Sequence, residues 1–189
     1  MSDTNLTKGQ TTNIFEIGNA PNLLELEINW KISPEKFKMF EIDAFAFLLK
    51  DDEKVRSDLD FIFHNHLDVD KNMCVVQKWQ KIKHNTTYEN FYLKINSVPE
   101  EIKKIVFCVS IYKASERKQS FNNLTGLEVK LKKEENVISN FKLEYTKEKI
   151  TDMILCEIYK YKNNWKFRAV TQGFDGGIKK LEKFYGVDQ

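Results

Sequence analysis

Four side chains with oxygen donors stand on or beside predicted β-strands: Asp43, Asp58, Asp60 and Asn65. Calcium takes six to eight hard oxygen ligands, usually from loops gathered at one end of a scaffold, and these residues could supply some of them. A metal-free alternative is that Asp58 and Asp60 cap turns and pair with Arg56 or nearby lysines. The sequence alone leaves both interpretations open.

Two histidines, His64 and His66, are two positions apart in a predicted strand, so both rings would project from one face. A shared transition metal would need a third ligand, and His84 would have to fold back to provide it. We therefore interpret them as a surface pair beside acids. The acidic run 68–72 lacks the glycine and distal glutamate of a helix-loop-helix calcium loop and is interpreted as a solvated turn.

Sequence motifs of enzymes are missing from the chain, which contains no Gly-x-Ser-x-Gly and no phosphate-binding glycine loop. The run Gln172–Gly177 is glycine-rich, but it lacks the Lys-Ser or Lys-Thr pair that would reach phosphates and magnesium. Its glycines are expected to turn the chain from a strand into a helix. We expect no enzymatic activity.

The elements that must position these residues are mostly strands. Lys104–Tyr112 alternates with apolar residues on both faces, which predicts a central strand. Phe91–Ile95, Leu127–Leu131 and Leu59–Asn65 have the same two-residue period. Many short strands with a turn signal about every ten residues favour a β-sandwich.

A hairpin is predicted near the end, where Met153–Tyr161 and Trp165–Val170 flank Lys162-Asn163-Asn164. The two asparagines tolerate the positive φ that a tight connection needs.

Two short helices complete the prediction. The first covers Pro99–Lys103, with proline early and acids in the first turn. The second covers about Gly177–Tyr185, with Ile178, Leu181 and Phe184 on one stripe and Gly186 as a left-handed cap. The expected fold class is thus mainly β, a two-sheet sandwich with a few short helices, including one at the C-terminus.

Composition fits one domain spanning 1–189, with an ordered core from about 6 to 187. The 189 residues are 41% hydrophobic, and 30 basic and 28 acidic side chains leave a formal charge of +2. This balance provides no overall electrostatic field that would attract the protein to nucleic acid or to an anionic membrane. Lysines do alternate with aromatic residues at 159–168, which is a pattern that can bind nucleic acid. We expect no nucleic-acid partner and no membrane insertion. Cys74, Cys108 and Cys156 are expected to be buried free thiols, which fits the cytoplasm.

Five blocks of the sequence occur in order from about residue 6 to residue 187. They are Leu6–Gly9, Phe40–Leu49, Lys54–Asn65, Glu116–Phe121 and Trp165–Gly177. Together they resemble the TerD family of bacterial tellurite-resistance and stress proteins. The resemblance implies a calcium-binding β-sandwich that takes part in responses to tellurite, other chemical stress and phage, with no established catalytic activity. Its partners would be other stress-response or membrane-associated family proteins, or a phage-defence complex.

Two departures from the family bear on calcium. The family's dense acidic loop is replaced by residues 84–89, where only Glu89 keeps a carboxylate, and the loss of about three charged ligands should weaken calcium sharply. Lys113 stands where the family tends to place an acid, and its charge would oppose a nearby cation. The resemblance therefore implies either a weakened calcium site that includes Glu89 or a metal-free scaffold. If Trp79 is exposed, its indole would mark a surface that binds a partner protein. The alternative is that the indole packs beneath the loop that carries it.

Overall fold

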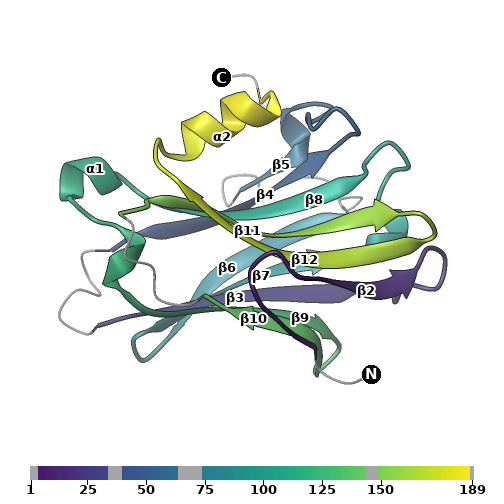
Figure 1. Cartoon of the computed structure of the whole chain (residues 1–189), viewed down its shortest axis with the longest axis horizontal. Helices are drawn as coiled ribbons and strands as arrows, with labels where there is room; N and C mark the ends of the chain where they lie inside the picture. The colour runs from purple at the N-terminus through teal and green to yellow at the C-terminus, as the bar shows by residue number, and fades with distance from the viewer. Residues whose placement is uncertain (1–3, 34–39, 64–73, 144–148, 188–189) are drawn as a thin grey trace.

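A computed structural model describes residues 4–33, 40–63, 74–143 and 149–187. Within them the chain forms two six-stranded sheets stacked face to face (Figure 1). In order across the first sheet lie β1 (Thr4–Leu6), β10 (Asn136–Lys142), β9 (Leu124–Lys133), β3 (Leu24–Ile32), β7 (Thr86–Leu93) and β6 (Val75–Lys83). In order across the second lie β2 (Thr11–Glu16), β12 (Asn164–Phe174), β11 (Asp152–Tyr161), β8 (Lys104–Ile111), β4 (Ile42–Leu49) and β5 (Phe61–Ile62). The predicted mainly β, two-sheet sandwich is confirmed.

Short helices lie between or after the strands. They are η2 (Asp58–Asp60), η3 (Ile95–Ser97), α1 (Ala114–Arg117), η4 (Phe121–Asn123) and α2 (Ile178–Tyr185). The predicted few short helices, with one near the C-terminus, are therefore present.

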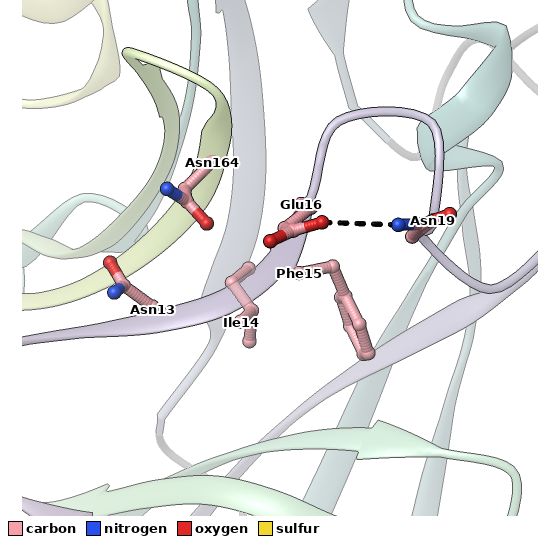
Figure 2. A pocket seen from close by; sticks show the side chains of 6 residues that line it. All are labelled: Asn13, Ile14, Phe15, Glu16, Asn19 and Asn164. Carbon is pink, nitrogen blue, oxygen red and sulfur yellow. Dashed lines mark hydrogen bonds between the residues drawn. The ribbon is translucent and has the colours of Figure 1, made fainter.

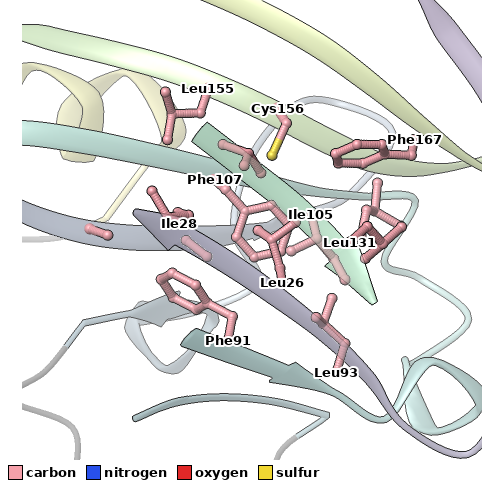
Figure 3. Packing of buried hydrophobic residues seen from close by; sticks show 14 of the residues in the cluster. Leu26, Ile28, Phe91, Leu93, Ile105, Phe107, Leu131, Leu155, Cys156 and Phe167 are labelled. Atoms are coloured by element: carbon pink, nitrogen blue, oxygen red, sulfur yellow. The ribbon is translucent and has the colours of Figure 1, made fainter. Parts of the chain in front are cut away.

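The inner core fills the space between the sheets because each strand turns alternate side chains inward. On β8, Ile105 and Phe107 face the first sheet, whereas Val106 and Cys108 face the opposite way. β8 lies between β11 and β4, so the predicted central strand is confirmed. Figure 3 shows the inner core, where Phe91 of β7 packs against Phe107 with ring centroids 5.2 Å apart.

A second hydrophobic cluster lies on the outer face of the second sheet, under α2 (Figure 1). Phe45, Phe47 and Leu49 of β4 point into this cluster, while Ala46 and Leu48 between them face the inner core. From α2, Leu181 and Tyr185 are buried against them, and the rings of Phe47 and Tyr185 lie 4.7 Å apart. Both faces of β4 are thus buried.

The predicted position of α2 is confirmed, but the predicted set of buried residues on the helix is wrong at one position. Gly186 caps the helix in the left-handed conformation, with φ of 81°. Tyr185 is buried, whereas Phe184 is 59% exposed. Tyr185 lies seven positions after Ile178, two full helical turns, and so shares its face with Ile178 and Leu181.

Two predicted elements are wrong in part. The strand expected over Leu59–Asn65 begins only at Phe61, because η2 turns the chain first and the Asp60 N–H donates to the Ser57 carbonyl at 3.0 Å. Asn65, the histidine pair and the acidic run 68–72 lie outside the described residues. The helix expected over Pro99–Lys103 is a single turn, since the Lys103 N–H donates to the Leu49 carbonyl of β4 instead of continuing a helix.

The predicted hairpin joins β11 to β12, with Tyr161 opposite Asn164. Its positive φ of 52° belongs to Lys162 and not to either asparagine.

The three cysteines are buried and free, as predicted. Within the described ranges, the structure contains no helix long and apolar enough to cross a membrane. The side chain of Trp79 is not among those described, so its prediction remains open.

Candidate functional site

Asp60 lies at the end of η2 with only 2% of its surface exposed, and its carboxylate is bound by Arg56. Arg56 Nε donates to Oδ2 at 2.8 Å, Nη2 donates to Oδ1 at 2.7 Å, and the Arg56 backbone N–H donates to Oδ2 at 2.9 Å. The hydrogen bond to Asp60 raises the pKa of the Arg56 guanidinium. Both carboxylate oxygens of Asp60 therefore accept hydrogen bonds from one guanidinium. This is the Arg56–Asp60 pairing that the metal-free interpretation predicts.

Glu89 is 3% exposed and points from β7 into the space between the sheets. One carboxylate oxygen accepts the Ala44 N–H of β4 at 3.3 Å, and the other accepts a short hydrogen bond from Gln77 Nε2 of β6. The same Nε2 donates to the Ala44 carbonyl at 2.7 Å. Among the described residues, the β4–β5 pairing joins Ala46 and Phe47 to Ile62 and Phe61 and does not extend to Ala44. Glu89 and Gln77 thus satisfy backbone groups of β4 that β5 does not reach.

The remaining described acid candidates lie elsewhere. Asp43 of β4 is on the side of the strand that carries Phe45, which is the outer face of the second sheet. Glu89 approaches β4 from the other sheet, through the sandwich interior. Asp58 is exposed on η2. Among the residues that the structure describes, no three His, Cys, Asp or Glu side chains gather into a group that could hold a metal ion.

Calcium does not fit these residues. The ion needs six to eight oxygens, but Asp60 is committed to a guanidinium and Glu89 to an amide and a backbone N–H. Lys113 follows β8 and precedes α1, where its ammonium lies 3.8 Å from Glu116.

The sequence pattern missed Asp152, a fully buried carboxylate at the start of β11. Its oxygens accept hydrogen bonds from Ser110 Oγ at 2.5 Å, Thr151 Oγ1 at 2.6 Å and the Gly177 N–H at 2.9 Å. Gly177 precedes the first turn of α2, so the negative charge of Asp152 is also stabilised by the positive end of the helix dipole. Asp152 anchors α2 to the sheet, and a lone Asp before an apolar strand carries no signal of this role.

A pocket of about 340 Å³ lies along β2, on the opposite edge of the second sheet from β5. It is lined by Asn13, Ile14, Phe15, Glu16, Asn19 and Asn164. Amides and a carboxylate lie close together in this lining (Figure 2), and Asn19 Nδ2 donates to Glu16 at 3.1 Å. The β2–β12 register shifts here, so the consecutive residues Ile14 and Phe15 are both buried in the inner core. The lining contains no Ser, Thr, Cys, Lys or His side chain and none of the predicted site residues.

Comparisons with known proteins give a consistent result. The TerD domain model matches residues 2–185. The chain is 31% identical over 186 residues to "Tellurium resistance protein TerD" of Serratia marcescens, with 97% of each chain covered. It is 27% identical over 193 residues to "General stress protein 16U" of Bacillus subtilis (strain 168), with 96% of each covered.

A solved structure described as a homologue of telluride resistance protein (TerD) from Streptomyces coelicolor A3(2) has the same fold. It superposes with a TM-score of 0.63 over 85% of this chain and 94% of its own, at 12% identity. With the match of the domain model across almost the whole sequence, these findings show that the chain belongs to the TerD domain family.

Proposed function

We propose that this chain is a non-enzymatic, protein-binding module of a bacterial response to chemical stress such as tellurite, and that it works without calcium. The stress-response part is supported by the names of two relatives that cover nearly the full chain, a tellurium resistance protein and a general stress protein. We assign it to the cytoplasm, where buried free thiols stay reduced.

Calcium independence is supported by the hydrogen bonds that the carboxylates of Asp60 and Glu89 already accept from protein groups. Arg56 already provides the positive charge that Asp60 needs, and Gln77 and Ala44 hold the carboxylate of Glu89. Recruiting either acid to calcium would break hydrogen bonds made by buried groups, which costs about 1–3 kcal/mol for each group left without a partner.

A module with no reaction of its own acts through the surface that it presents to other proteins. We propose that its partners are other stress-response or membrane-associated proteins of the same response, with a phage-defence complex as the second setting.

The test is a tellurite-tolerance assay in a bacterium that lacks its own TerD-family gene. The intact chain should restore tolerance, and so should a variant with Asp43→Asn and Asp58→Asn, because these acids are not required as calcium ligands. Equal amounts of soluble protein provide the control. Failure of the intact chain to restore tolerance would contradict the stress role, and failure of the variant alone would contradict calcium independence.

A further inference from the structure

The β6–β7 hairpin carries an unbalanced surface charge. From Val75 to Lys94 the sequence contains Lys78, Lys81, Lys83 and Lys94 but only one acid, Glu89. All four lysines are exposed, whereas Glu89 is turned into the sandwich interior. The surface of this hairpin is therefore positive in a chain whose formal charge is only +2.

Two tyrosines lie among these lysines on the outer face of the first sheet. Lys78 Nζ is 4.3 Å from the ring centroid of Tyr92, and Lys81 is opposite Tyr88 in the β6–β7 register. Val76, 40% exposed, is opposite Tyr92. We define the Tyr–Lys face as Val76, Lys78, Lys81, Tyr88 and Tyr92.

Acids on the neighbouring strand do not neutralise the Tyr–Lys face. Glu25 and Glu27 of β3 lie beside β7, but they form ion pairs with lysines of β9, the strand on the opposite side of β3. Lys132 Nζ lies 2.5 Å from Glu27 and 3.8 Å from Glu25, and Lys130 Nζ lies 3.8 Å from Glu27. In the part of the chain that the structure describes, Lys78 and Lys81 form no ion pair.

We propose that the Tyr–Lys face is a docking surface for an acidic segment of a partner protein. This inference rests on the proposed function and names the chemistry of its partner. Carboxylates of the segment pair with Lys78 and Lys81, and such complementarity sets specificity and association rate. Tyrosines supply large contact areas at low entropic cost, as they commonly do at interfaces. Exposed Val76 supplies apolar contact between the charges.

The experiment uses the full chain and a fluorescein-labelled peptide of alternating glutamate and valine, followed by fluorescence anisotropy at low salt. Binding should fall about tenfold or more when Lys78→Glu and Lys81→Glu are combined, since like charges then face each other. The matched control combines Lys162→Glu with Lys166→Glu. It makes the same charge change around Tyr161, whose ring lies 4.4 Å from Lys166 Nζ, and should change binding by less than about twofold.

Three results would overturn the inference: no binding of the peptide, equal loss in both variants, or tighter binding of a labelled oligothymidylate of equal charge. The last would assign the face to nucleic acid. The outcome is separable from the proposed function, because tellurite tolerance can fail while peptide binding persists. Conversely, tolerance can be restored by a chain that does not bind the peptide.

Discussion

Two outer surfaces of the sandwich differ in what covers them. On the second sheet, the outer face of β4, β5 and β8 is apolar and lies under α2, where Phe47 of β4 packs against Tyr185. The outer face of the first sheet carries ion pairs between β3 and β9, and the Tyr–Lys face lies beside them. No helix of the described residues covers the outer face of this sheet (Figure 1). The covered face stabilises the fold, and the open face remains available for binding.

The largest effect that separates the two faces should come from Phe47→Ala. Phe47 is fully buried under α2, so its truncation should lower the free energy of unfolding by about 3–5 kcal/mol. Tyr92→Ala on the open face should cost less than about 1 kcal/mol. Urea denaturation measures both, and similar losses would show that the two faces do not differ as described.

A smaller loss is expected from Asp152→Asn, which weakens the anchor of α2. The amide keeps the size of the side chain but turns one acceptor into a donor that faces existing donors, at a cost of about 1–3 kcal/mol. Limited proteolysis at 174–177 should accelerate as well. The control is Asp175→Asn on the exposed side of the same junction, and an equal effect there would contradict a special role for Asp152.

Thiol modification distinguishes the layer under α2 from the inner core. Burial raises the pKa of Cys108 and Cys156 well above the usual value, so in the native protein neither should react readily with iodoacetamide at mildly alkaline pH. Cys108 lies in the cluster under α2 and Cys156 in the inner core. In Asp152→Asn, mass spectrometry should detect Cys108 modified before Cys156, and the reverse order would argue against local release of α2.

Much of the fold could be predicted from sequence because the information is local. The two-residue period identified β8, and Gly186 marked the end of α2. The errors occurred where the two-residue period does not reveal the local conformation. At η2 the Asp60 carboxylate accepts hydrogen bonds from Arg56, four positions earlier, and after Pro99 a long-range hydrogen bond from the Lys103 N–H to the Leu49 carbonyl ends the turn.

The contacts of Glu89 and Asp152 were less predictable because they join residues that are distant in the sequence. The direction in which Glu89 points depends on which face of β7 is inward, and its partners Gln77 and Ala44 come from two other strands. Asp152 binds groups up to 42 positions away in the sequence. Residue type suggested oxygen ligands, but only the register of the strands reveals that these carboxylates already have partners.

Asp60 and Glu89 are held by protein groups, and we propose that the chain works without calcium. The most direct test is the thermal midpoint of the purified protein in EDTA, in millimolar calcium and in millimolar magnesium. A site that is filled at a hundred times its Kd would add about 2.7 kcal/mol, or roughly 5–10 °C for a chain of this size. We predict a shift below about 1 °C in either ion. A calcium-specific rise of several degrees that disappears in Glu89→Gln or Asp60→Asn would contradict calcium independence.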